Sequence, residues 1–256
     1  LELALESVPS TASLYARALI SGRSGAALPQ SPMLLATATL KGQRIEGERL
    51  ADYRQVCGFD DSLSGNAVPA TYPFVLAMPL QLSLLVSDAF PFPVLGIVHL
   101  RNAITQHRPI DAADLLDFSC ELAGPRAVRR GFEFDLTTRV YVGGALVWEC
   151  VSTMLRPEKR KASGARSGSR ENASRSAKSP VEMLHARVVS EWQVGADMGR
   201  RYARVSGDRN PIHLYALSAR LFGFPSAIAH GMWTKARCLA ELEIELTRER
   251  QAERLA

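Results

Sequence analysis

The sequence lacks the features of a metal-binding, secreted or membrane-spanning protein. Its cysteines are scattered at positions 57, 120, 150 and 238, with no C-x-x-C pair and no histidine at zinc-ligand spacing. No N-terminal stretch joins a basic region to an apolar one, as a signal peptide would. The longest apolar run, residues 75–86, is too short for the roughly 20 residues that span a bilayer. We therefore expect a cytoplasmic protein with no metal and no membrane partner.

The net charge of +5 comes from one short stretch of the chain. Seven basic and two acidic residues lie between positions 158 and 178, and they account for the whole excess. Residues 158–180 are otherwise rich in serine, glycine and alanine and contain no large apolar side chain, which is typical of a flexible linker. We predict a linker there, dividing the chain into residues 1–157 and 181–256. Because the rest of the chain is neutral, we expect no nucleic-acid partner.

The two parts of the chain carry similar patterns. The sequence YRQVCG at residues 53–58 matches YARVSG at residues 202–207, and each is followed by a proline, Pro69 or Pro225, that opens an apolar stretch. Five residues after these prolines stand Phe74 and His230. Three features in the same order favour a duplicated unit.

The first part predicts one buried helix followed by a run of strands. Residues 69–86 form the apolar helix, with strain expected at Pro79. Stretches rich in Val, Phe, Tyr and Thr then predict strands at 95–104, 116–122, 131–142 and 145–155. A helix followed by antiparallel strands suggests an α+β fold in which a sheet wraps around one helix.

The second part predicts a strand over Met183–Val194, a short helix over 197–205 and a longer helix from about Ala229. The longer helix carries an apolar stripe that we expect to lie in a core, made of Met232, Ala236, Leu239, Leu242 and Leu246. Since few residues follow this stripe, the second sheet would lack most of its strands. Either the intact chain extends past Ala256, which is our expectation, or a partner supplies the missing surface.

The most informative segment is YARVSGDRNPIH, residues 202–213, which holds Asp208 five residues before His213. In a turn shaped by its glycine and proline, both side chains could point at one spot. A carboxylate and an imidazole that converge can activate a water and move its proton. The alternative is an ordinary helix start, with Asn210 as N-cap and Pro211 at the first helical position.

A second clue is the segment IAHGM, residues 228–232, where Gly231 lies at the start of the long helix. Backbone N–H groups at a helix N-terminus are unpaired, so Gly231 could stabilise the negative charge that develops on a thioester oxygen. Alternatively, the glycine allows close packing. His230 could act as a ligand or catalyst, or it could be a hydrogen-bonded core residue.

Together with GFP at residues 223–225, these two segments closely resemble the signature of the MaoC-like, or type 2 (R)-specific, enoyl-CoA hydratases. The resemblance implies a hotdog fold, in which an antiparallel sheet wraps a long central helix. It further implies a double hotdog, with a degenerate unit at 1–157 and a catalytic unit at 181–256 that is truncated at its C-terminus.

The resemblance also implies the site. The family's catalytic pair falls on Asp208 and His213, and its oxyanion glycine falls on Gly231. We add Asn210 and His230 to the substrate-binding set. The first unit should be non-catalytic, because no histidine follows Gly58 at the matching distance, and it should instead widen the acyl tunnel.

The activity implied is reversible hydration of trans-2-enoyl thioesters to (R)-3-hydroxyacyl thioesters in fatty acid metabolism. The substrate would be carried by coenzyme A or by an acyl-carrier protein, no cofactor or metal would be needed, and the protein would be a homodimer. Two alternatives stay open: a hotdog thioesterase, and a non-catalytic protein that binds acyl-CoA or serves as a scaffold.

Overall fold

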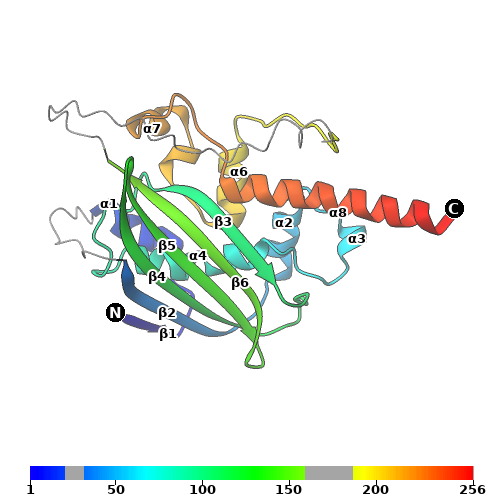
Figure 1. The fold of residues 1–256 in the computed structure, drawn as a ribbon, viewed down its shortest axis with the longest axis horizontal. Coiled ribbons are helices and arrows are strands. Elements are labelled where there is room, and N and C mark those ends of the chain that lie inside the picture. The colour runs from blue at the N-terminus through cyan, green and yellow to red at the C-terminus, as the bar shows by residue number, and fades with distance from the viewer. Residues whose placement is uncertain (21–31, 159–186, 256) are drawn as a thin grey trace.

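The computed structural model describes residues 1–20, 32–158 and 187–255 (Figure 1). Its strands are β1 (Glu2–Leu5), β2 (Met33–Gln43), β3 (Val98–Gln106), β4 (Leu116–Val128), β5 (Gly131–Val142) and β6 (Ala145–Pro157). The helices before residue 158 are α1 (Thr11–Ile20), α2 (Gly47–Cys57), α3 (Asp61–Ser64) and α4 (Tyr72–Leu85). After residue 187 they are α6 (Met198–Ser206), the 3₁₀-helix η1 (Pro211–His213), α7 (Ala216–Leu221) and α8 (Gly231–Leu255). Within these ranges, no helix is long and apolar enough to cross a membrane.

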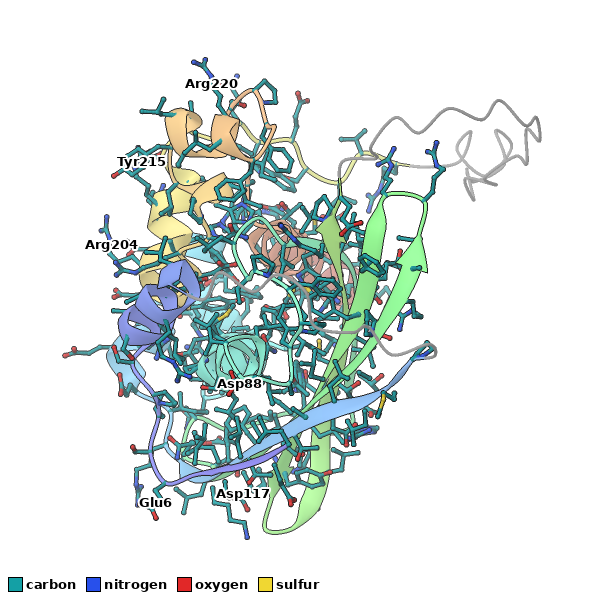
Figure 2. The ribbon with its side chains drawn as sticks, turned by 90° about the vertical axis from the view of Figure 1, so that its left-hand side faces the viewer. Glu6, Asp88, Asp117, Arg204, Tyr215 and Arg220 are labelled. Carbon is teal, nitrogen blue, oxygen red and sulfur yellow. The ribbon has the colours of Figure 1, made fainter. Side chains whose placement is uncertain are left out.

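One six-stranded sheet, in the order β1-β2-β4-β5-β6-β3, curves around helix α4. All neighbouring strands pair antiparallel except β1 and β2, which pair parallel. Figure 2 looks along α4 and shows the sheet below and beside it. This arrangement confirms the predicted α+β class, with a sheet wrapped around one helix.

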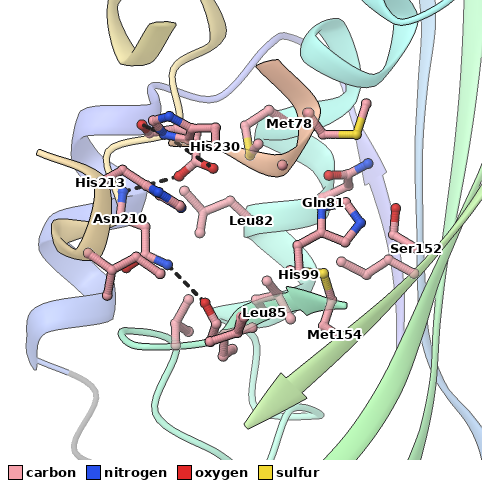
Figure 3. A pocket seen from close by; sticks show the side chains of 18 of the residues that line it. Met78, Gln81, Leu82, Leu85, His99, Ser152, Met154, Asn210, His213 and His230 are labelled. Carbon is pink, nitrogen blue, oxygen red and sulfur yellow. Dashed lines mark hydrogen bonds and ion pairs between the residues drawn. The ribbon is translucent and has the colours of Figure 1, made fainter. Parts of the chain in front are cut away.

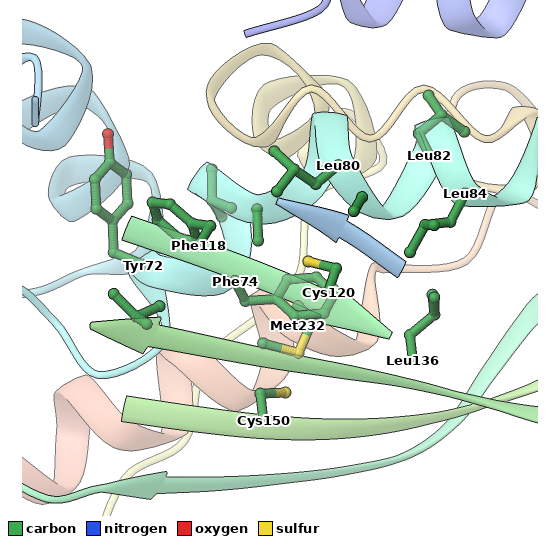
Figure 4. Close-up of a cluster of buried hydrophobic side chains, with 14 of the residues drawn as sticks. Tyr72, Phe74, Leu80, Leu82, Leu84, Phe118, Cys120, Leu136, Cys150 and Met232 are labelled. Carbon is green, nitrogen blue, oxygen red and sulfur yellow. The ribbon is translucent and has the colours of Figure 1, made fainter. Parts of the chain in front are cut away.

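Helix α4 is buried on almost every side, as its nearly unbroken apolar sequence requires. Its side chains Leu80 and Leu84 are fully buried in a core that also contains Phe118 and Leu136 of the sheet (Figure 4). Pro79 lies inside the helix without ending it. The predicted helix 69–86 and the four predicted strands are therefore confirmed, with their ends shifted by a few residues.

The expected strand Met183–Val194 is not formed where the structure can test it. Residues 187–194 belong to no sheet, and residues 183–186 lie outside the described ranges, as does the predicted linker from residue 159 onward. A strand needs a neighbour to pair with, and no backbone group of residues 187–194 bonds to a described strand. Instead, the ring of Trp192 packs against the guanidinium of Arg237, whose central carbon lies 5.2 Å from the ring centre.

The expected core stripe of α8 is only half correct. Met232 and Ala236 are buried and Leu239 is partly buried, but Leu242 and Leu246 are 47% and 51% exposed. Figure 1 shows the reason, because α8 extends beyond the sheet. In the described part of the chain, the later turns of α8 face no second layer, and the expected second sheet is not seen among residues 187–255.

The repeated sequence pattern gives the same local structure twice. Helices α2 and α6 each end at a glycine, Gly58 or Gly207, with φ of 78°. Each glycine donates its N–H to the carbonyl four residues earlier, a C-cap that only glycine adopts without strain. The rings of Tyr53 and Tyr202, from the two copies of the pattern, lie 6.3 Å apart where the helices meet.

Polar contacts hold residues 187–255 against the first part of the chain. The indole of Trp233 donates to the carbonyl of Val56 at 3.1 Å. The ammonium of Lys235 donates to the side-chain oxygen of Asn102 on the edge strand β3 at 2.6 Å. These two bonds fix the N-terminal half of α8 between α2 and β3.

Candidate active site

Asp208 follows the left-handed turn that ends α6. Its backbone N–H donates to the Ser206 hydroxyl at 3.1 Å, and its Oδ1 accepts the backbone N–H of Asn210 at 3.1 Å. This Asx-type turn leads directly into η1, at whose end stands His213. Both local interpretations of the sequence are therefore partly right, because a turn and a short helix start occur together. Asn210 does not cap η1 with its side chain, which instead donates to the carbonyl of Ile97 at 3.0 Å.

Hydrogen bonds to backbone carbonyls set the tautomers of two histidines. His213 Nδ1 lies 2.8 Å from the carbonyl oxygen of Ile228, and His230 Nε2 lies 3.2 Å from that of Asp208. Because a carbonyl can only accept, these two nitrogens carry the protons of the neutral rings. The Nε2 of His213 consequently keeps a free lone pair, and it can act as a base.

Asp208, His213 and His230 form one cluster, in which ligand atoms from all three lie within 4.8 Å of one another. The two imidazole rings stack at a centroid distance of 3.8 Å and an interplanar angle of 26°. An imidazole binds a metal through a lone pair in its ring plane, and near-parallel stacked rings do not direct their lone pairs at one ion. The donor set therefore suits a water molecule held by hydrogen bonds.

The cluster keeps Asp208 ionised. Burial acts to raise the pKa of this carboxyl, but the neighbouring His230 and His213, the N–H of Asn210 and the hydroxyl of Tyr15 together hold it below its usual value. The Tyr15 hydroxyl donates to Asp208 Oδ1 at 2.9 Å. Sequence analysis missed Tyr15, which belongs to α1 and precedes Asp208 by 193 residues.

His230 is 2% exposed, and burial lowers its pKa to about 4 although Asp208 acts in the opposite direction. Since the unfolded chain binds a proton near pH 6.5 and the folded chain only near pH 4, stability should fall as pH drops through this window. Across the whole window, protonation of His230 should lower the free energy of unfolding by about 3 kcal/mol. Denaturant unfolding at several pH values should show this slope in the native sequence and a clearly weaker one in His230→Gln.

The exposed His107 provides the control for that measurement, because His107→Gln also removes one histidine but leaves the cluster intact. If stability fell equally steeply with decreasing pH in His230→Gln and in His107→Gln, the pH dependence could not be assigned to His230.

Gly231 is the first residue of α8 and lines the same cavity as the cluster. A Cβ atom added at this glycine would meet no atom within 4 Å, so close packing does not explain it. The first N–H groups of a helix have no partner within the helix. Gly231 therefore offers a backbone donor at the cavity that Asp208, His213 and His230 also line.

The cavity itself has a volume of about 230 Å³ and reaches from this cluster to α4, β3 and β6 (Figure 3). Much of its wall is apolar, including Phe74, Met78, Leu82, Leu85, Leu136 and Met154. All five residues expected at the site, Asp208, Asn210, His213, His230 and Gly231, line it. The shape and lining suit an acyl chain whose reacting end lies at the cluster.

Comparison with known proteins places this geometry in a family. A family model described as MaoC like domain matches residues 174–253. The 3-hydroxyacyl-thioester dehydratase X of Mycobacterium tuberculosis is 39% identical over 207 residues, which cover 81% of this chain and 70% of the relative. The chain belongs to the MaoC-like dehydratase family. The resemblance stated from the sequence segments is thereby confirmed.

Solved structures agree with the family and its hotdog fold. A crystal structure of HtdX from M. tuberculosis superposes with a TM-score of 0.66 at 35% identity, covering 82% of this chain and 77% of that one. The peroxisomal multifunctional enzyme type 2 of Drosophila melanogaster gives a TM-score of 0.54 at 16% identity, covering 83% of this chain and 38% of that one. At that identity the likeness shows the fold alone.

Proposed function

We propose that this chain catalyses the reversible hydration of trans-2-enoyl thioesters to (R)-3-hydroxyacyl thioesters. The observation that carries the proposal is the meeting of three groups at one end of the cavity. These are the ionised carboxylate of Asp208, the free lone pair on His213 Nε2 and the N–H of Gly231. The activity named for the mycobacterial relative supports the same reaction.

In the hydration direction, Asp208 and His213 hold one water beside C3 of the substrate. One of the two bases takes a proton from the water as its oxygen bonds to C3, and the electron pair of the C2–C3 double bond moves toward the thioester oxygen. The N–H of Gly231 stabilises the resulting enolate oxygen. The pair of bases then delivers a proton to C2 on the same face, which returns both to their starting protonation, and dehydration follows this path in reverse.

The two carboxylate oxygens of Asp208 have different surroundings and so can have different roles. Oδ1 accepts from both the Tyr15 hydroxyl and the Asn210 N–H. Among the described residues, no hydrogen bond reaches Oδ2, which lies 3.8 Å from His230 Nε2. Tyr15 and Asn210 are therefore positioning residues in this mechanism, and Oδ2 is the oxygen left to bind the reacting water.

The first part of the chain would supply the acyl tunnel and no catalytic group. Asp60, which follows Gly58 in the first copy of the repeat, accepts the N–H of Ser62 at 2.8 Å and so caps α3. Helix α4 and strands β3 and β6 instead form the cavity wall. We further propose that the acyl chain is carried by coenzyme A or by an acyl-carrier protein. We also predict a cytoplasmic location and a homodimer.

The test is to follow the loss of enoyl-thioester absorbance with trans-2-enoyl-CoA substrates of increasing chain length, with assignment of the product's configuration. We expect the (R)-3-hydroxyacyl product. Release of free thiol instead would identify a thioesterase. Binding of acyl-CoA without turnover would identify a non-catalytic protein.

A further inference from the structure

The cavity has a polar wall opposite the catalytic cluster. Three polar residues contribute to it, Gln81 from α4, His99 from β3 and Ser152 from β6. Figure 3 shows them at one side of the cavity, with Asn210, His213 and His230 at the other and Leu82 and Leu85 between. An acyl tunnel made only to hold a hydrocarbon chain has no use for such groups, because any of their polar atoms that lack a partner in the protein lose water without replacing it.

His99 presents a buried, unpaired nitrogen. No hydrogen bond from the described residues reaches its Nε2, which is shielded from solvent. The ring stacks on Phe74 at 5.8 Å, which fixes its orientation. Burial, the largest influence, lowers the pKa of His99, so the ring is neutral at physiological pH. In the tautomer that carries its proton on Nδ1, the neutral ring presents Nε2 as a hydrogen-bond acceptor.

Gln81 and Ser152 add further hydrogen-bonding capacity. Gln81 is 3% exposed, and its amide nitrogen donates to the Thr138 hydroxyl at 3.0 Å. Within the described chain, no donor reaches its amide oxygen. The Ser152 hydroxyl is buried, accepts from the amide of Asn102 at 2.9 Å and lies 3.6 Å from the thiol of Cys150, where either group can donate. The wall therefore offers two acceptors and one hydroxyl.

We propose that this wall binds a hydroxyl group on the acyl chain, beyond C3, so that the preferred substrates are acyl thioesters with a second oxygen substituent. The inference rests on the proposed function. A hydroxyl can donate to His99 or Gln81 and accept from Ser152, whereas a ketone or a carboxylate can only accept. An ammonium group would have to bury its charge without a carboxylate beside it on this wall.

The experiment compares trans-2-enoyl-CoA substrates that carry one hydroxyl at successive carbons beyond C3. Each is paired with the unsubstituted chain and with the ketone of the same length. At the best position, kcat/KM should be at least about tenfold higher for the hydroxylated chain than for either partner. In His99→Phe and Gln81→Met this ratio should fall toward one, while both variants still turn over the unsubstituted chain.

Met154→Leu provides the matched control, because it changes an apolar side chain in the same cavity at nearly constant volume. It should keep the preference for the hydroxylated chain. Turnover of unsubstituted chains with a ratio near one at every position would overturn the inference and leave the proposed function standing, with water at the wall. An absence of turnover with all substrates would overturn both. The thermal midpoint of each variant separates loss of binding from loss of folding.

Discussion

Replacing Asp208 with Asn is expected to lower kcat/KM for enoyl-CoA hydration by about 10² to 10⁴. The amide keeps the size of the side chain and can still accept from Tyr15 and the Asn210 N–H. It removes the negative charge and the basic oxygen that the proposed mechanism requires at Oδ2. Steady-state kinetics with one trans-2-enoyl-CoA, together with a thermal unfolding curve, measures the effect in folded protein.

Tyr15→Phe gives the graded comparison. It deletes one of the two hydrogen bonds to Oδ1 and leaves the carboxylate in place, so the loss should stay within about tenfold. Because the Tyr15 hydroxyl also helps to hold the pKa of Asp208 down, the acid limb of the pH–rate profile should move to higher pH. Near-native activity in Asp208→Asn would remove this carboxylate from the mechanism.

The second large effect is expected from Gly231→Pro, which should lower kcat by about 10² to 10³. Proline is well tolerated at the first position of a helix, so α8 should still form, but its backbone has no N–H to stabilise the enolate oxygen. The variant therefore removes one donor atom from the site while the helix start is kept.

Gly231→Ala is the matched control. The added methyl group meets no atom within 4 Å and the N–H is retained, so kcat should stay close to the native value. If the proline ring acted only by filling the cavity, KM would rise and kcat would be preserved. An equal loss of kcat in Gly231→Ala and Gly231→Pro would show that the N–H is not the feature that matters.

The sequence was most informative where chemistry depends on neighbouring residues. Asp208 and His213 lie in one continuous segment, so its turn residues offered the meeting of the two side chains as one of two interpretations, and the family resemblance favoured it. The central helix and four strands could be predicted because apolar runs and alternation record burial directly.

Contacts between residues that are far apart in the sequence leave no such pattern in the local sequence. Tyr15 reaches Asp208 only because α1 packs against α4 and lies beside Gly207 in the folded chain. Nothing in the sequence around Tyr15 indicates a partner 193 residues away. Gln81 and His99 lie in or beside apolar stretches, where a single polar residue does not reveal whether it faces a core or a cavity. The exposure of Leu242 and Leu246 depends on how far the sheet extends, which helical periodicity does not encode.

The division of the cavity between two parts of the chain has an evolutionary consequence. The groups proposed to act on the reacting atoms, Asp208, His213 and Gly231, lie within residues 208–231, whereas the wall opposite them comes from α4, β3 and β6. Substitutions in that wall can change which acyl chain fits without altering the groups that react with it. Selection could thus diversify the substrates of such enzymes through one half of the gene while the half that encodes the chemistry stays under separate constraint.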